Sequence, residues 1–208
     1  MRFAWTCLIA LLVGAAASGG CIIAGYAAHV YGDPPVPARF VLGPHLTAIV
    51  VRDQPDPTGQ TVEGEVLASE IEQNIKAKNA GIIVPSVKTS DLRSSDPNKF
   101  ESMTPQQIGH AVGAEQIIYV EVERSSVSAG EGNDMLKGQI AATVAVYEMH
   151  GGTMLWPTDG SSGDSVTYAT PTLRANGDVN SFNMRRNIYA GLADKVAKLF
   201  YTYKPDEE

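Results

Sequence analysis

"TPQQIGHAVGAEQIIYVEVERSSVS", residues 104–128, contains a complete helix signal followed directly by a long strand signal. Thr104 is a good N-cap, and Pro105 suits the first helical position. Gln107 stands where a capping box needs Glu or Gln, and Gly113 closes the helix. The apolar run that follows predicts a strand that enters the core.

A second long strand follows this one in the sequence. The segment "LKGQIAATVAVYEM", residues 136–149, is apolar, and the Gly-rich "AGEGND", residues 129–134, separates it from the first strand. Two strands joined in this way predict an antiparallel hairpin. Next, "HGGTMLWP", residues 150–157, turns through its two glycines into a short strand that ends at Trp156.

The chain before the hairpin alternates between strand and helix patterns. The β-branched run "HLTAIVVRD", residues 45–53, predicts a buried strand. A helix is predicted from Thr61 to about Asn79, with an apolar stripe made of Val62, Leu67, Ile71 and Ile75. A second strand is predicted at Ile82–Ser86. Ser90–Ser102 is expected to be a short polar connection with room for one helical turn.

After the hairpin, "SVTYAT", residues 165–170, predicts another strand. Ser181 opens a last helix that is predicted to run to about Tyr203. Its apolar residues alternate at spacings of three and four: Tyr189, Leu192, Val196, Leu199 and Tyr203. An amphipathic helix depends on packing that face, so it either docks on the sheet of its own domain or is available to a partner helix.

The N-terminal segment has the order of a secretory signal peptide. Arg2 precedes an apolar run that gives way to small residues, Gly14 to Gly20. "SGGC", ending at Cys21, resembles a bacterial lipobox, although Ser18 stands where Leu is usual. Three interpretations remain open: lipid attachment at Cys21, an uncleaved transmembrane anchor, and cleavage after Ala15–Ala17. All three place the rest of the chain outside the cytoplasm, either in the periplasm or facing the cell exterior.

Cysteine usage and proline content suggest how the chain is divided. Cys7 would leave with a cleaved signal, so Cys21 would have no intramolecular disulfide partner and acts as a tether. The proline-rich "YGDPPVPARF", residues 31–40, predicts a semi-rigid spacer. The expected organisation is therefore a signal peptide at 1–20, an anchor cysteine and spacer at 21–44, one globular domain at 45–204, and a tail at 205–208. The fold class is α/β (α+β): a mixed β-sheet with a long antiparallel hairpin, flanked by helices.

The composition argues against nucleic-acid binding. The 208 residues carry a formal net charge of −7, and removal of residues 1–20 would take away only the positive charge of Arg2. Phosphate binding needs clustered Lys and Arg, whereas Arg185–Arg186 is the only dibasic step.

No catalytic or metal-binding motif stands out, and no cofactor is expected. The histidines are dispersed, without an H-E-x-x-H pattern: His29, His45, His110 and His150. Glu121 and Glu123 are two apart on one strand, which suits either a carboxylate pair or a solvated sheet face. The loop with Asp159, Ser161 and Asp164 could ligate calcium but lacks EF-hand spacing. The alternative to a non-enzymatic protein is an envelope hydrolase in which these acidic residues meet in a cleft.

The segment from Ile108 to Trp156 resembles the βαββ core of envelope domains of the TolB amino-terminal type. That class also covers the lipoprotein of curli secretion and lipoprotein activators of penicillin-binding proteins. The resemblance is carried by a helix ending in Gly113, Ala114 and Glu115, by the following strand, and by Gly152 leading into a strand that ends at Trp156. The layout is also similar to that of planctomycete envelope lipoproteins.

This resemblance implies a fold and a location but no activity. The first strand lacks the family's usual Pro-Phe ending, and no β-propeller follows, so the family's partner is not carried over to this chain. The expected function is that of a membrane-anchored, non-enzymatic envelope lipoprotein. It would serve an envelope complex as an interaction or accessory module, with an envelope protein as its partner.

The anchor is testable with one substitution. Cys21→Ser should move the protein from the membrane fraction to the soluble fraction and abolish labelling with a fatty-acid probe, because a modified cysteine carries enough buried CH₂ groups to anchor stably. Fractionation and probe labelling measure both effects. Unchanged membrane retention of the variant would instead favour the spanning helix.

Overall fold

The structure is a computed structural model of the chain, and it describes residues 34–53, 62–129 and 134–205. The chain forms two compact units. One consists of Ala38–Tyr201, and the other combines Met1–Pro37 with Thr202–Glu208. Within the second unit, Val36 and Tyr203 form an antiparallel bridge. The predicted signal peptide, the lipid attachment site Cys21 and most of the predicted hairpin loop lie outside the described residues.

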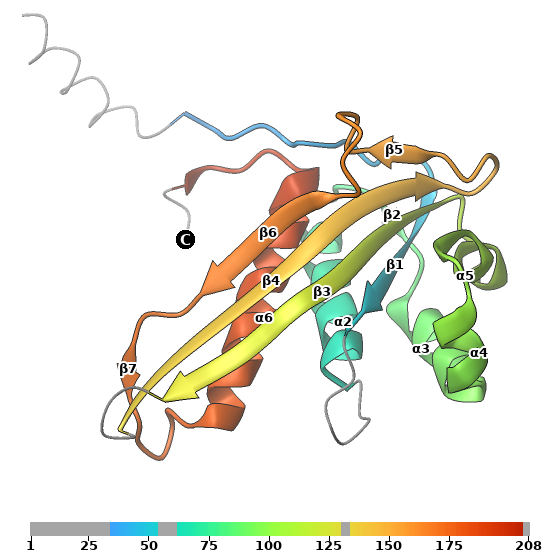
Figure 1. The fold of residues 1–208 in the computed structure, drawn as a ribbon. Coiled ribbons are helices and arrows are strands. Elements are labelled where there is room, and N and C mark those ends of the chain that lie inside the picture. Colours follow the sequence, from blue (N-terminus) through green and yellow to red (C-terminus); the bar gives the residue numbers. More distant parts are fainter. Residues whose placement is uncertain (1–33, 54–61, 130–133, 206–208) are drawn as a thin grey trace, which may run out of the picture. The chain divides into compact units, whose positions relative to one another are not determined.

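The larger unit is built on a seven-stranded mixed sheet (Figure 1). Its path runs β2-β1-β3-β4-β5, and β6 and β7 also pair with β4. β1 is parallel to both β2 and β3, whereas all pairs made by β4 are antiparallel. The strands are β1 (Leu46–Arg52), β2 (Ile82–Ile83), β3 (Gln116–Ala129), β4 (Met135–Glu148), β5 (Met154–Trp156), β6 (Asp164–Ala169) and β7 (Leu173–Arg174). The predicted mixed sheet with a long antiparallel hairpin is confirmed.

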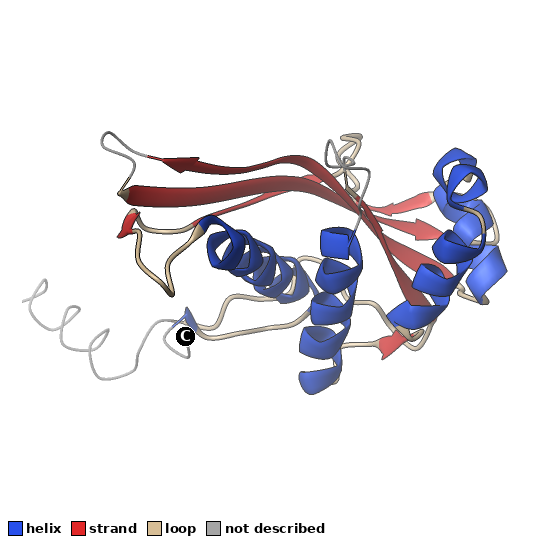
Figure 2. Cartoon of the chain, turned by 90° about the horizontal axis from the view of Figure 1, so that it is seen from below, coloured by secondary structure: helices blue, strands red, loops and turns tan. Residues whose placement is uncertain are grey.

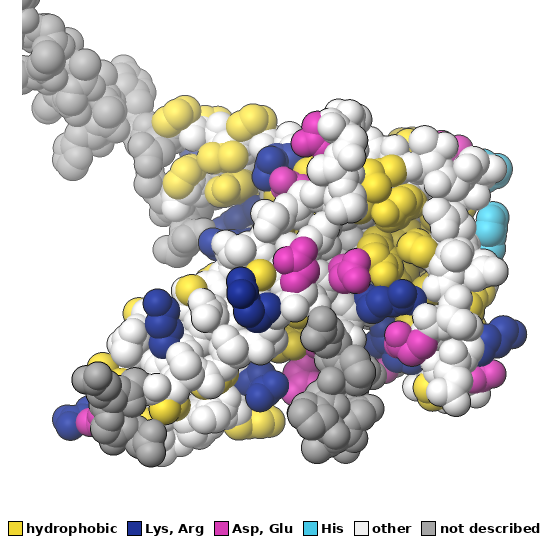
Figure 3. All heavy atoms as spheres, in the orientation of Figure 1, with side chains coloured by type: hydrophobic (Ala, Val, Ile, Leu, Met, Phe, Trp, Pro, Cys, Tyr) yellow, Lys and Arg dark blue, Asp and Glu magenta, His cyan; other side chains and the backbone are white. Residues whose placement is uncertain are grey.

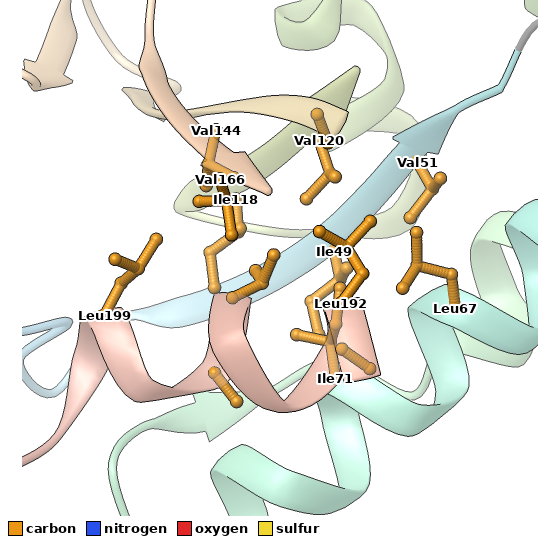
Figure 4. Packing of buried hydrophobic residues seen from close by; sticks show 14 of the residues in the cluster. Ile49, Val51, Leu67, Ile71, Ile118, Val120, Val144, Val166, Leu192 and Leu199 are labelled. Carbon is orange, nitrogen blue, oxygen red and sulfur yellow. The ribbon is translucent and has the colours of Figure 1, made fainter. Parts of the chain in front are cut away.

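Two helices, α2 (Val62–Ala77) and α6 (Ser181–Ala197), lie on one face of this sheet (Figure 2). Residues from both helices and from one face of the strands form the main core, as Figure 4 shows for part of it. The predicted stripe of α2 is fully buried at Leu67, Ile71 and Ile75. α6 buries Leu192 and Val196 completely, so its apolar face docks on its own domain.

Three shorter helices pack against the opposite face, at the end of the sheet where β1 and β2 lie. They are α3 (Ser86–Ser95), α4 (Pro97–Ser102) and α5 (Pro105–Val112). Phe100, Ile108 and Val112 from these helices form a second core cluster with residues of β1 and β3. The prediction of one helical turn at most in Ser90–Ser102 was therefore wrong. The Asp96 carboxylate accepts the backbone N–H of Lys99 and so caps α4. This cap allows a second helix to start after the single residue Asp96 that follows α3.

The boundaries of α5 follow the sequence signals closely. The Thr104 hydroxyl accepts the N–H of Gln107, and the Gln107 side chain accepts the N–H of Thr104, which completes the predicted capping box. Gly113 ends the helix with φ at 74°, a left-handed conformation that glycine adopts without steric cost.

Two other predicted boundaries were too long. The strand predicted at Ile82–Ser86 ends at Ile83, because Pro85 takes the N-cap position of α3. The last helix was expected to reach Tyr203, but it ends at Ala197 and continues only as a 3₁₀ turn, η1 (Lys198–Phe200). Tyr203 therefore belongs to no helical stripe.

The residues that carry the family resemblance lie along the path from α5 to β5. The Glu115 carboxylate accepts the backbone N–H of Leu46, so it fixes the start of β1 next to β3. Ala114 is buried in the second cluster, and Gly152 has φ at 66° in the turn before β5. Trp156 is 8% exposed and lies in the main core between the rings of Phe40 and Phe200. Among the described helices, none is long and apolar enough to cross a membrane.

The packing of Trp156 predicts a large stability effect. Trp156→Ala should lower the free energy of unfolding by about 3–5 kcal/mol, because it leaves a cavity between two aromatic rings. Phe182→Ala is the control: that ring is 70% exposed, so its removal should change stability by less than about 0.5 kcal/mol. Urea denaturation of both variants measures the difference, and equal effects would contradict the packing described.

Candidate functional site

A groove of about 300 Å³ lies between α2 and α3, next to β1. Its lining combines aliphatic groups, four hydroxyl side chains, one carboxylate and one guanidinium: Ile49, Val51, Gly64, Glu65, Val66, Ala68, Ser69, Ser86, Val87, Thr89, Ser90 and Arg93. Ligand sites commonly combine apolar walls with a few polar groups in this way.

The groove exists because β2 is only two residues long. β2 pairs with β1 at Leu46 and Thr47, and Val84 adds one further bond by donating its N–H to the Thr47 carbonyl at 2.9 Å. The chain then leaves the sheet at Pro85 to begin α3. The next backbone donor, the N–H of Ser86, is bonded to the Glu72 carboxylate at 2.7 Å instead of to β1. Beyond Thr47, this edge of β1 therefore has no neighbour among the described strands.

Arg93 projects from α3 to this open edge and is 8% exposed. Its Nη2 donates to the Val51 carbonyl at 2.6 Å, and its guanidinium carbon lies 4.6 Å from the ring centre of Phe100. Its Nε is buried and has no hydrogen-bond partner among the described residues. A buried polar group without a partner costs free energy, so an acceptor beside this nitrogen would be stabilising.

The charge of Arg93 is only partly balanced. Burial lowers the pKa of this guanidinium, and the nearby Glu65 and Glu101 carboxylates act in the opposite direction. Neither acid forms an ion pair with Arg93 in the part of the chain that the structure describes, although Glu65 also lines the groove. A buried cation without a bonded anion is unusual, because its desolvation is not repaid by a close opposite charge.

The open edge also leaves backbone groups unpaired. Along a strand, the N–H and C=O groups of alternate residues point to the same side. Since the carbonyls of Thr47 and Val51 point toward this edge, the N–H and C=O of Ile49 and the N–H of Val51 point there as well. Across the described residues, these three groups have no hydrogen-bond partner on that side. Along this edge, the groove thus offers the Ile49 N–H as a donor, the Ile49 carbonyl as an acceptor and the Val51 N–H as a second donor.

The acidic residues singled out in the sequence do not meet in a cleft. Glu121 and Glu123 lie on the face of the sheet that α2 and α6 do not cover, where charged side chains of both signs are interspersed (Figure 3). Both side chains are exposed, and Glu123 accepts a hydrogen bond from the Thr143 hydroxyl. This arrangement is that of a solvated sheet face.

Asp164 lies on the opposite face of the sheet from Glu121. It is in register with Val144, which belongs to the main core, and its carboxylate pairs with Arg39. Asp159 accepts hydrogen bonds from the N–H and hydroxyl of Ser161, which lower the pKa of its carboxyl in an exposed loop. The four-carboxylate cleft of the hydrolase interpretation was therefore wrong.

No metal site is visible in residues 34–53, 62–129 and 134–205, where no three His, Cys, Asp or Glu side chains come together in a way that could hold an ion. His45 lies near the Glu115 carboxylate, at 3.6 Å from Nδ1 to Oε2. His110 is in α5 and His150 is in the turn before β5, so the described histidines stay dispersed.

Comparison with known proteins gives distant structural likenesses only. No protein-family profile matches the chain, and no curated protein matches it. The lipoprotein GNA1162 from Neisseria meningitidis aligns with a TM-score of 0.43 and 10% identity, over 73% of this chain and 98% of that one. The hypothetical protein CT253 from Chlamydia trachomatis has a TM-score of 0.42 and 10% identity, over 76% and 98%.

A minor lipoprotein from Acinetobacter baumannii aligns with a TM-score of 0.38 and 10% identity, over 79% of this chain and 99% of that one. At such TM-scores and identities, these likenesses carry no inference about the function of this chain.

Sequence patterns alone did not indicate Arg93. It lies in a polar segment, "SDLRSSDPNKF", whose composition suits a surface connection. The available signal was the helical spacing of Thr89 and Arg93, which are four residues apart. In the structure, both are buried on the side of α3 that faces β1.

The burial of the Arg93 charge predicts that substitution of this residue has an unusually small effect on stability. Arg93→Met removes a charge-assisted hydrogen bond worth about 1.5–3 kcal/mol but also removes the desolvation cost of a buried cation, which is of similar size or larger. The free energy of unfolding should therefore change by less than about 1 kcal/mol, as measured by urea denaturation. A loss above about 3 kcal/mol would show that Arg93 is a structural cation and would argue against a binding role.

Proposed function

We propose that this chain is a membrane-anchored, non-enzymatic envelope lipoprotein that binds another envelope protein through the groove between α2 and α3. The observation that carries the proposal is a set of groups in that groove without hydrogen-bond partners among the described residues: the Nε of Arg93 and three backbone groups of Ile49 and Val51. Unpaired buried polar groups are costly in a free protein and favour a ligand that completes them.

The chemistry of the groove favours binding over catalysis. Its hydroxyl side chains, at Ser69, Ser86, Thr89 and Ser90, have no described histidine beside them to act as a general base. Arg93 cannot serve as a base, since a guanidinium stays protonated. Glu65 is the one carboxylate in the lining. An acid–base mechanism of the glycosidase kind needs two placed carboxyl groups.

The predicted anchor and the family resemblance support the envelope location. The lipobox-like sequence before Cys21 and the resemblance to envelope domains of the TolB amino-terminal type both suit a domain held at a membrane surface. Such a domain needs a binding surface that faces its partner, and the rim of the groove supplies exposed aliphatic side chains at Val66 and Val87.

Site-specific crosslinking in intact cells tests this proposal. A photoreactive amino acid at Val87, on the rim of the groove, should give one discrete crosslinked envelope protein, because this side chain is 58% exposed and next to the site. The same amino acid at Leu173 is the matched control: it is exposed and aliphatic but lies on β7, which pairs with the far end of β4.

The expected result is a crosslinked species from position 87 that is absent from position 173. A discrete species from position 173 with none from position 87 would move the interaction surface away from the groove. Identical patterns from both positions would contradict a localised binding site.

A further inference from the structure

The geometry points to a specific occupant of the groove: the C-terminal end of a partner polypeptide, bound in an extended conformation with its terminal carboxylate on Arg93. This inference rests on the proposed binding function and adds the chemistry of the partner. It follows from three features of the groove, which are its length, its charge and its unpaired backbone groups.

The space along β1 is limited at both ends. Val84 is bonded to Thr47 at one end, and Arg93 is bonded to Val51 at the other. A strand rises about 3.3 Å per residue, so the open stretch from Thr47 to Val51 is about 13 Å long. That length suits about three residues of an extended chain. A longer strand that continued through the groove would meet the Arg93 side chain, so a chain end fits better than an internal segment.

The unpaired backbone groups suit strand addition. An incoming residue could accept from the Ile49 N–H, and a following residue could donate to the Ile49 carbonyl, as Val84 does to the Thr47 carbonyl. The Val51 N–H would then donate to the last residue. Because Arg93 lies at the carboxyl end of β1, a carboxylate on Arg93 makes the bound segment parallel to β1, in line with β2.

The charges favour an anion with a single negative charge over a dianion. The Nε of Arg93 is without a partner, and a carboxylate oxygen is a strong acceptor for a guanidinium donor. Glu65 lines the same groove, so a dianion such as a phosphate would meet a repelling carboxylate. A terminal carboxylate satisfies Arg93, and the peptide N–H groups beside it add no charge.

The rim favours an aliphatic last residue. Val66 and Val87 are 44% and 58% exposed, and both line the groove. Covering them would remove apolar surface from water, which stabilises a complex. The groove therefore suits a peptide whose final residues carry small or branched aliphatic side chains.

NMR titration tests this inference with the full-length protein in detergent micelles. The probe is a pool of N-acetylated pentapeptides that is randomised at the last three positions and ends in a free carboxylate. Its control is the same pool with a C-terminal amide. The free-acid pool should shift the amide signals of Ile49 and Val51, and the amidated pool should bind at least tenfold more weakly. Arg93→Met should weaken binding of the free-acid pool to the level of the amidated pool.

Each other outcome overturns the inference. Equal binding of both pools would show that the terminal carboxylate is not recognised. Because the amidated pool contains Asp and Glu, Arg93 would then bind either an acidic side chain or no anion of the peptide. Shifts confined to residues that do not line the groove would place the peptide elsewhere. If neither pool binds while the crosslink from position 87 persists, the groove binds its partner in another way; if that crosslink is also missing, the proposed function itself fails.

Discussion

The early end of β2 is the constraint on which the groove depends. Pro85 takes the chain out of the sheet after two paired residues, and Ser86 gives its N–H to Glu72 instead of to β1. β1 is the central parallel strand of its half of the sheet, so the edge that β2 leaves open is deep in the domain, where Ile49 and Val51 are almost fully buried. α3 covers this edge with Arg93 and does not replace the missing strand.

Contacts with β3 and at both ends of the strand hold β1 in place, although its other edge is open. β3 pairs with β1 from Thr47 to Arg52, and the Glu115 carboxylate fixes its first residue. At the other end, the Tyr189 hydroxyl donates to Asp53 at 2.7 Å, which ties β1 to α6; burial and this bond raise the pKa of Tyr189. Two core clusters, one on each face of the sheet, stabilise the fold. Their packing offsets the free-energy cost of the unpaired groups in the groove.

Local sequence signals were sufficient for much of the fold but not for the site. The capping box around Thr104 and the long hairpin depend on neighbouring residues, so the sequence predicted both. α3 and α4 were missed because their composition is polar, and their helical state depends on Asp96 and on burial of Phe100. Arg93 was missed for a related reason: its role comes from the distant residues Val51 and Glu65, and no local pattern records such contacts.

Hydrogen exchange of the free protein tests the open edge most directly. In the same micelles, the amides of Ala48 and Val50 point toward β3 and should be strongly protected. Those of Ile49 and Val51 point into the groove and should exchange at least tenfold faster, although they belong to the same strand. A period-two pattern of protection along β1 is the result that this account predicts. Uniform protection from Ala48 to Val51 would contradict it, since the amides of Ile49 and Val51 would then either have partners or be closed to an incoming chain.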